Sequence, residues 1–560
     1  MAKRFQYANE NPSASEIGAI FKRPEGRINI ALVYPNNYPV GMSSLGFQTV
    51  YRLFNEYGHV VCERAFLPQQ GPSDASGIKT VESCRDLKQF DIVAFSVSFE
   101  NDYPNILRIL DTAGIPLKAE HRNSGLPLII AGGVACFLNP EPLASFIDCF
   151  LIGEAEAVLP EFFKTYDPKR SRSSNLLCLA RHVPGAYVPA LYETVFDSDG
   201  AVKTFEPVTD VPIKVCRPYA EDISGFSTTS TVISPHAPFG RMFLIEVGRG
   251  CPHRCRFCST GYVYRPPRFR SLGRLADAMN QGIALTDHIG LVGAAVTDLP
   301  DLPALCRLAS ETDARVSFSS LRADRLSGEI IEVLRNSRIK TAAIAPDAGS
   351  ERMREVIKKG LTEEAVLAAV QRLVEAGIPN VKLYFMVGLP TETAEDVEAI
   401  VKLVARAKTV FLTAGRSKKR VGTITVSLNP FVPKPFTPFQ WTAAADGKSI
   451  KQKIKHVTNG LKSLPNVRVF AESPRQAHHQ ALLSRGDRQV GGFLIHLHKN
   501  KGNWAKTLKE TALNTDFYTK EEMVDRILPW HFIDHGFDVS RLKEEYRRAL
   551  HTSAALLPMH

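Results

Sequence analysis

The stretch GRGCPHRCRFCSTGYVYRP (residues 248–266) brings Cys251, Cys255 and Cys258 together within eight residues. It directly follows an apolar run at 242–247 that has the length and composition of a buried strand. The three cysteines are therefore expected on a loop at the carboxyl end of a strand. Thiolates spaced C-x3-C-x2-C can each ligate one iron of a [4Fe–4S] cluster and leave the fourth iron open.

A zinc site is the alternative interpretation of this loop, with His253 as a fourth ligand. Structural zinc usually takes two separated pairs of ligands, which a single short loop does not provide. We therefore expect His253 to face solvent. The other cysteines are scattered, and several lie in apolar runs where a reduced thiol packs as a small hydrophobic group. They are Cys62, Cys84, Cys136, Cys149, Cys178, Cys216 and Cys306.

Strand-like runs recur after the loop and alternate with helical segments. They lie at 242–247, 288–296, 316–320, 341–345, 381–387 and 422–428. One helical segment, at 361–377, has Thr362 as its expected N-cap and acidic residues in its first turn. Six β/α units in sequence predict an incomplete parallel barrel over 238–440.

A second β/α region precedes the barrel. Buried-strand runs at 28–35, 91–100, 126–133 and 148–156 alternate with helical stretches, which predicts an α/β domain at 1–165 with a doubly wound, flavodoxin-like sheet. A connector with a hairpin closed at 197–200 is expected over 166–237, and a mostly helical region with a strand-like run near its start over 441–560. Sheets of this kind bind ligands at the carboxyl ends of their strands.

Composition sets the broad class. The chain has 560 residues, 44% of them hydrophobic, and a formal net charge of +11. These values exclude disorder, collagen-like repeats and coiled coil as the main state. Neither a spanning apolar run nor an N-terminal signal core is found, so we expect a cytoplasmic protein with no membrane partner. The charge permits an anionic partner without requiring one.

The cysteine loop, with Phe257 before its last cysteine and a six-fold β/α region around it, resembles the signature of the radical S-adenosylmethionine (radical SAM) superfamily. The resemblance implies that the open iron chelates S-adenosylmethionine, whose reductive cleavage produces a 5′-deoxyadenosyl radical. It also implies a reductant such as flavodoxin or ferredoxin as a partner.

Segments on the later strands match places that contact S-adenosylmethionine in this superfamily. From these segments and the cysteine loop, the resemblance implies that the following residues contact S-adenosylmethionine: Phe257, Gly293, Ala294, Asp298, Arg322, Asp347, Ser350 and Gly388. The Gly293-Ala294-Ala295 segment departs from the usual Gly-Gly-Glu, so backbone carbonyls or Asp298 would substitute. Three of the residues have plain alternatives: an ion pair of Arg322 with Asp324, a helix cap at Ser350 and a steric need for Gly388.

The first sheet resembles cobalamin-binding domains, in which small residues at strand ends line the ligand's channel. The residues concerned are Ser96, Ser98, Gly132, Gly133, Gly153 and Glu154. The loop at 34–46 lacks the cobalt-ligating histidine of the mutases, as is common in cobalamin-dependent radical SAM proteins. A flavodoxin-like domain that has lost the corrinoid is the alternative.

The order of these segments, with the C-terminal runs LSRGDRQVGGFL and LPWHFIDHGF, resembles an uncharacterised family of cobalamin-domain radical SAM proteins. Three functions follow. The first is a cobalamin-dependent enzyme that methylates an unactivated carbon of an unknown small-molecule, protein or RNA substrate. The second is an RNA-modifying enzyme related to the methylthiotransferases, supported by basic stretches at 265–274 and 416–420, with a non-binding sheet domain. The third is a non-enzymatic iron–sulfur or zinc protein.

Overall fold

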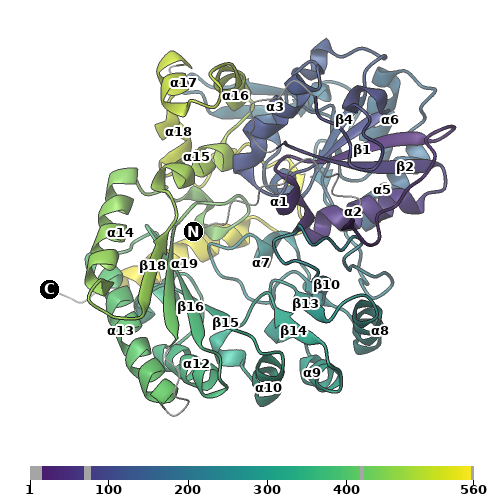
Figure 1. Cartoon of the computed structure of the whole chain (residues 1–560). Helices are drawn as coiled ribbons and strands as arrows, with labels where there is room; N and C mark the ends of the chain where they lie inside the picture. The colour runs from purple at the N-terminus through teal and green to yellow at the C-terminus, as the bar shows by residue number, and fades with distance from the viewer. Residues whose placement is uncertain (1–14, 69–76, 417–421, 512, 556–560) are drawn as a thin grey trace.

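The computed structural model describes residues 15–68, 77–416, 422–511 and 513–555. The N-terminal stretch 1–14 and most of the basic stretch 416–420 lie outside these ranges. In Figure 1 the first sheet and its helices lie at the upper right, the strands of the second β/α region lie below, and the C-terminal helices α14 to α18 run along the left. None of the helices described is long and apolar enough to cross a membrane.

The first sheet has six strands in the order β2-β1-β3-β4-β5-β6. The strands are β1 (Ile28–Tyr34), β2 (Val60–Phe66), β3 (Ile92–Ser96), β4 (Leu128–Gly132), β5 (Cys149–Leu151) and β6 (Ala186–Tyr187). The first five are parallel, and β6 pairs antiparallel with β5. The order changes direction between β1 and β3, which is where open α/β sheets form a ligand crevice. The expected doubly wound α/β fold is confirmed.

The apolar pattern of the sequence does not predict strand β2, because two charged residues interrupt its apolar run. Glu63 and Arg64 are both buried in the middle of the strand. Arg64 forms ion pairs with Glu16 and Glu82, at 2.6 Å in each case, so its charge is neutralised within the protein. Buried charges of this kind are stable only when they are paired.

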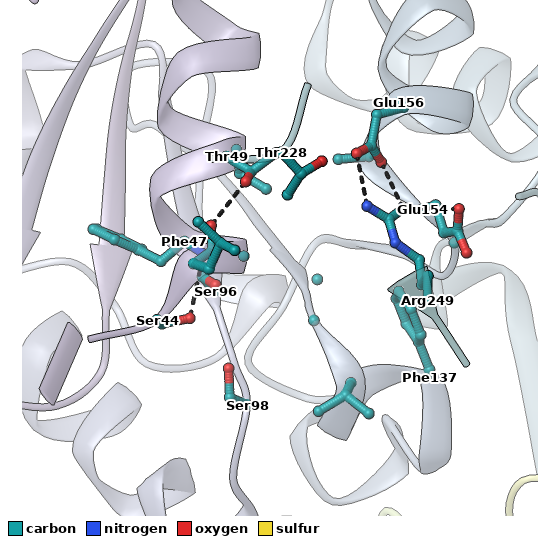
Figure 2. A pocket seen from close by; sticks show the side chains of 18 of the residues that line it. Ser44, Phe47, Thr49, Ser96, Ser98, Phe137, Glu154, Glu156, Thr228 and Arg249 are labelled. Atoms are coloured by element: carbon teal, nitrogen blue, oxygen red, sulfur yellow. Dashed lines mark hydrogen bonds and ion pairs between the residues drawn. The ribbon is translucent and has the colours of Figure 1, made fainter. Parts of the chain in front are cut away.

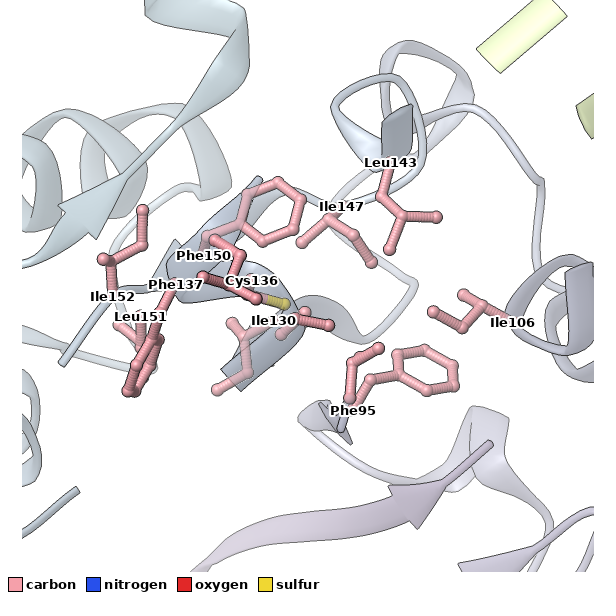
Figure 3. Packing of buried hydrophobic residues seen from close by; sticks show 14 of the residues in the cluster. Phe95, Ile106, Ile130, Cys136, Phe137, Leu143, Ile147, Phe150, Leu151 and Ile152 are labelled. Atoms are coloured by element: carbon pink, nitrogen blue, oxygen red, sulfur yellow. The ribbon is translucent and has the colours of Figure 1, made fainter. Parts of the chain in front are cut away.

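Helices cover both faces of the first sheet. They include α2 (Leu45–Glu56), α3 (Tyr103–Thr112), α5 (Ala155–Thr165) and α6 (Arg172–His182). Figure 3 shows the packing beneath the carboxyl ends of the strands, where Cys136 lies among Phe95, Ile130 and Phe150. Cys136 is fully buried there, as expected for a thiol that packs as a hydrophobic group. The predicted hairpin is present as β7 (Tyr192–Phe196) and β8 (Val202–Pro207).

All six strands predicted for the second region are present, in two parallel sheets. β10 (Phe243–Glu246), β13 (His288–Val292) and β14 (Arg315–Phe318) form one parallel sheet. β15 (Thr341–Asp347), β16 (Asn380–Val387), β17 (Thr423–Pro430) and β18 (Val467–Ala471) form another. The additional strand, β18, is the strand-like run expected at the start of the C-terminal region, and it extends the second sheet.

Helices pack on one face of these two sheets. They are α8 (Leu272–Ile283), α9 (Leu302–Ser310), α10 (Gly328–Asn336), α12 (Glu363–Glu375), α13 (Ala394–Arg416) and α14 (Gly447–Leu461). Thr362 caps α12 as predicted, since its hydroxyl accepts from the Ala365 amide at 3.2 Å. Alternate residues of each strand join the helices in one hydrophobic core. The other face of each strand forms the interior of the partial barrel.

The C-terminal region is mostly helical, as expected. It contains α15 (Pro474–Arg485), α16 (Val490–Lys499), α17 (Trp504–Thr511), α18 (Thr515–Thr519) and α19 (Ser540–Ala555). Helix α16 packs on α3 of the first sheet, and α19 packs on α11 (Glu351–Val356) of the second region. A short parallel pairing of β19 (Ile533–Asp534) with β9 (Val215–Cys216) ties this region to the connector. The C-terminal region therefore bridges both β/α regions.

Candidate functional site

The cysteine loop follows β10 at its carboxyl end, and two short paired strands close the base of the loop. It leaves through β11 (Gly248–Arg249) and returns through β12 (Arg268–Phe269), and these two strands pair antiparallel. Gly250 has a φ of +86°, and a Cβ atom there would lie 2.2 Å from the Tyr264 carbonyl oxygen. The close approach of the two limbs therefore requires glycine at this position.

The three cysteines differ in exposure. Cys255 is buried, whereas Cys251 and Cys258 are partly exposed. Burial raises the pKa of the Cys255 thiol to about 12, and the nearby Lys359 ammonium acts in the opposite direction. Burial also raises the pKa of Cys251. A thiolate in this loop therefore needs a cationic partner, which an iron ion provides.

His253, the fourth ligand of the zinc interpretation, has a carboxylate partner. Its Nε2 lies 3.0 Å from Asp298 Oδ1, on the loop after β13. The ring is 26% exposed rather than fully solvent-facing. Among the described residues, no three His, Cys, Asp or Glu side chains converge closely enough to hold a single metal ion. Each of the three thiols on the loop can bind its own iron of a cluster.

Arg256 anchors the cysteine loop to the second region and to the C-terminal helix. Its guanidinium donates to the Val356 carbonyl at 2.8 Å and to Glu545 of α19 at 3.2 Å. Its backbone amide donates to the Ile357 carbonyl at 3.0 Å. Sequence reasoning did not single out Arg256, because its partners lie about 100 and 289 residues away.

Around the loop lie the residues predicted to contact S-adenosylmethionine. Gly293 follows β13, and its carbonyl accepts hydrogen bonds from the Ser319 and Ser320 hydroxyls, both at 3.1 Å. Arg322 pairs with Asp324 at 3.0 Å, which is the ion pair given as its alternative. Phe257 is half-buried and packs against a hydrophobic cluster shared by the first sheet and the C-terminal region. The roles of these residues in binding S-adenosylmethionine stay predictions.

The remaining predicted contacts also have local partners. Asp347 is paired with Lys359 and has a φ of +65°. Ser350 caps α11: its hydroxyl accepts from the Met353 amide at 3.0 Å and donates to Asp396 at 2.6 Å. Gly388 has a φ of +82°, and a Cβ there would lie 2.4 Å from Ile450 Cδ1. The helix cap and the steric requirement are thus both present, and the ligand roles stay predictions.

One cavity of about 480 Å³ joins the two β/α regions. On the first sheet it is lined by the carboxyl ends of β3, β4 and β5 and by α2, and on the other side by the ends of β10 and β13 and by the cysteine loop. Figure 2 shows the hydroxyl-bearing Ser44, Ser96 and Ser98 on one wall and Phe137 and Arg249 on the other. All six residues predicted for cobalamin line it: Ser96, Ser98, Gly132, Gly133, Gly153 and Glu154. Gly293 and Ala294 line the same cavity.

Two of the predicted glycines are also explained by packing. Gly133 has a φ of +105°, and a Cβ atom there would lie 2.4 Å from the Val97 carbonyl oxygen. At Gly153 a Cβ would lie 2.8 Å from Pro218 and Val158. Their small size is therefore required by the protein itself and is not evidence of a ligand. Gly46, which sequence reasoning missed, faces the cavity without such a contact.

A charged seam, formed by Glu154, Glu156, Glu246, Arg249, Arg268 and Arg270, closes one side of the cavity. Arg249 donates to Glu154 at 2.9 Å, to Glu156 at 3.0 Å and to Glu246 at 3.0 Å. Glu154 also accepts from Arg268 at 2.6 Å. Burial disfavours the charge of Glu154, but its arginine partners hold its pKa below the usual value. The carboxylate predicted to contact cobalamin is thus engaged in joining the two regions.

Comparisons with known proteins agree with this architecture. The family of radical SAM proteins, N-terminal, matches residues 46–189, and the radical SAM superfamily matches residues 245–404. "Uncharacterized protein MJ0966" of Methanocaldococcus jannaschii is 30% identical over 87% of this chain and 94% of the relative. A tRNA-2-methylthio-N(6)-dimethylallyladenosine synthase of Thermotoga petrophila is 28% identical over 31% of this chain and 42% of the synthase.

Solved structures with a similar fold are more distant. The radical S-adenosylmethionine methyltransferase TsrM of Kitasatospora setae has a TM-score of 0.47 and 14% identity, covering 71% of this chain and 72% of TsrM. The cobalamin-dependent S-adenosylmethionine radical enzyme OxsB, with aqua-cobalamin bound, has a TM-score of 0.44 and 17% identity, covering 68% of this chain and 52% of OxsB.

Proposed function

Because this chain belongs to the radical SAM superfamily, we propose that it binds a [4Fe–4S] cluster through Cys251, Cys255 and Cys258 and reductively cleaves S-adenosylmethionine. The observation that carries the proposal furthest is the cavity shared by the cysteine-loop side of the partial barrel and the carboxyl edge of the first sheet. Two cofactors bound on its opposite sides would face each other across one cavity.

The residues present fit an iron–sulfur cluster. The three thiols lie on one loop, and Gly250 and Arg256 hold that loop against its surroundings. Lys359 supplies a positive charge near Cys255, which favours the thiolate. When bound together, the cluster and S-adenosylmethionine supply a 5′-deoxyadenosyl radical able to abstract hydrogen. The part of the protein is to position the reactants and exclude water.

We assign the contacts with S-adenosylmethionine to residues at the carboxyl ends of successive strands. Gly293 and Ala294 line the shared cavity. Arg322 has the charge to pair with the methionine carboxylate, although it now pairs with Asp324. Asp347 and Ser350 follow β15, and Gly388 follows β16, on the same edge of the second sheet.

We propose that cobalamin binds at the shared cavity, on the side formed by the carboxyl edge of the first sheet. The walls are mainly apolar, with hydroxyls at Ser44, Thr49, Ser96 and Ser98. No histidine is among the described residues lining it, so cobalt bound there would have no histidine ligand from this wall. Methylcobalamin, when bound, supplies a methyl group, and we propose methylation of an unactivated carbon.

The test is anaerobic reconstitution of the full chain, followed by assay of 5′-deoxyadenosine, S-adenosylhomocysteine and cobalamin absorbance, with a flavodoxin or a chemical reductant as electron source. Cys255→Ala is expected to abolish deoxyadenosine formation. The matched control is Cys216→Ala, since Cys216 is exposed and distant in sequence from the loop. Deoxyadenosine formation by Cys255→Ala would refute the cluster assignment. Absence of any affinity for hydroxocobalamin in the wild type would refute the cobalamin and methylation steps alone.

A further inference from the structure

The interior face of the four-stranded sheet carries side chains that the proposed chemistry does not use. Along β16, Val381, Leu383 and Phe385 are buried in the core formed with the helices. Successive side chains of a strand point to opposite faces, so Lys382 and Tyr384 point into the partial barrel. Both are partly exposed.

The strand register aligns these side chains with those of the neighbouring strands. Lys382 pairs with Thr425, and Thr425 pairs with Arg468, so that the three form one row across the sheet. Tyr384, Ser427 and Phe470 form the next row in the same way. We call these two rows the inner sheet face: Lys382, Thr425, Arg468, Tyr384, Ser427 and Phe470.

The inner sheet face combines aromatic rings with cations that lack acidic partners. Phe470 is 59% exposed on the edge strand β18, which is unusual for a phenylalanine on a sheet. Lys382 Nζ lies 4.3 Å from the centre of the Tyr384 ring. In the described part of the chain, neither Lys382 nor Arg468 forms an ion pair with a carboxylate. The face is therefore positively charged, aromatic and open.

Two of the four arginines in the basic stretch at 265–274 do not contribute positive charge to the surface. Arg268 and Arg270 are both buried, and they pair with Glu154 at 2.6 Å and with Glu246 at 2.7 Å. Positive charge that is neutralised inside the protein cannot attract an anionic partner. The unpaired cations of the inner sheet face come instead from isolated positions in two different strands.

We propose that the inner sheet face binds single-stranded RNA, with bases stacked on Tyr384 and Phe470 and phosphates beside Lys382 and Arg468. Aromatic side chains on an open sheet stack bases, and nearby cations contact the phosphates. Thr425 places a partly exposed hydroxyl between Lys382 and Arg468, where a ribose 2′-hydroxyl can be bonded. The inference rests on the proposed function, for which it names the class of substrate.

The position of the face relative to the cysteine loop fits a substrate. Met386 lies two residues beyond Tyr384, about 7 Å further along the strand, toward the carboxyl end of the sheet. The same carboxyl end of the sheet carries Asp347 and Gly388. RNA lying along the inner sheet face would therefore lead its target nucleotide toward the predicted site of hydrogen abstraction.

Fluorescence anisotropy of a labelled single-stranded RNA of about 12 nucleotides tests this proposal on the full-length protein without a reductant. Phe470→Ala is expected to weaken binding roughly 5- to 150-fold, which corresponds to the loss of one stacked base. Arg468→Gln should lower the salt-dependence slope by about 0.7. Tyr384→Phe keeps the ring and should bind like the wild type. Matched controls are Phe21→Ala, at a residue 64% exposed elsewhere, and Lys402→Gln on α13.

Several results would overturn the proposal: no RNA binding at low salt, equal affinity of Phe470→Ala and Phe21→Ala, or a DNA of the same sequence binding as tightly as RNA. Displacement of the RNA by AMP at an equal concentration would assign the face to a free nucleotide instead. The two proposals fail separately. RNA binding without deoxyadenosine formation on reduction contradicts the proposed chemistry, whereas deoxyadenosine formation without RNA binding contradicts this inference.

Discussion

Replacing Arg249 with methionine should loosen the charged seam between the two β/α regions. The five N–H groups of this guanidinium can donate five hydrogen bonds, and five are present, to Glu154, Glu156 and Glu246. Without Arg249, Glu154 still pairs with Arg268, and Glu246 still pairs with Arg270. Glu156 has Arg249 as its only ion-pair partner in the described part of the chain, and its side chain is 9% exposed.

The expected loss of stability comes from leaving the Glu156 carboxylate buried and unpaired. Removing one partner of a buried ion pair costs about 3–5 kcal/mol. If the loss is local, hydrogen exchange at residues 153–158 and 248–252 should accelerate roughly a hundred- to several-thousand-fold, since 1.36 kcal/mol is a factor of ten. The double variant Arg249→Met with Glu156→Gln removes the unpaired charge and should recover most of the protection.

The assay is hydrogen exchange by mass spectrometry, with the urea midpoint as a second measure. Arg241→Met is the matched control, because Arg241 is an exposed arginine close in sequence to the seam. If Arg249→Met exchanges no faster than Arg241→Met, the seam does not hold the two regions together. If Glu156→Gln fails to restore protection, the cost does not come from the unpaired carboxylate.

Three other perturbations have outcomes set by the same structure. Gly133→Ala should lower the free energy of unfolding in urea by about 1–3 kcal/mol, because Gly133 has a φ of +105° and a Cβ atom there would contact Val97. Gly46→Ala should change the free energy of unfolding by no more than about 0.5 kcal/mol. Glu154 and Glu246 have pKa values below the ordinary one, so the stability they contribute is present above about pH 4.3 and is lost as the pH falls through their lowered values. A urea midpoint that Glu246→Gln leaves equally dependent on acid pH would contradict this. Ser96→Leu should reduce corrinoid retention, measured by absorbance after gel filtration, without reducing bound iron, and unchanged retention would place cobalamin elsewhere.

Most of the fold could be predicted because most of its strands are apolar runs in the sequence. β1, β10, β13 and β16 all lie where buried-strand runs were expected. β2 could not be found in this way, because its central Glu63 and Arg64 resemble an exposed segment. What makes them tolerable is pairing with residues far away in sequence, such as Glu16 for Arg64. A local pattern carries no information about such partners.

In the candidate site, the positions of residues could likewise be predicted from local sequence, whereas their interaction partners could not. The cysteines and the cavity-lining Ser96, Ser98 and Gly132 were predictable because each follows a recognisable strand. The partners of the polar residues were not, as the pairing of His253 with Asp298 shows. Glu154 lines the predicted cavity, yet its oxygens are bound by arginines more than 90 residues away. Position along a strand is encoded locally, whereas the use of a side chain depends on the tertiary fold.

The net charge of +11 illustrates why that distinction matters for function. The basic stretch at 265–274 is conspicuous in the sequence, but its Arg268 and Arg270 neutralise glutamates inside the seam. Lys382 and Arg468 are inconspicuous in the sequence, and only the register of β16, β17 and β18 brings them into one row, on either side of Thr425. Long-range attraction of an anion depends on charges left unpaired. Charge that serves assembly and charge that serves recognition therefore occupy different residues of this protein, and the RNA titration with Arg468→Gln and Lys402→Gln separates them experimentally.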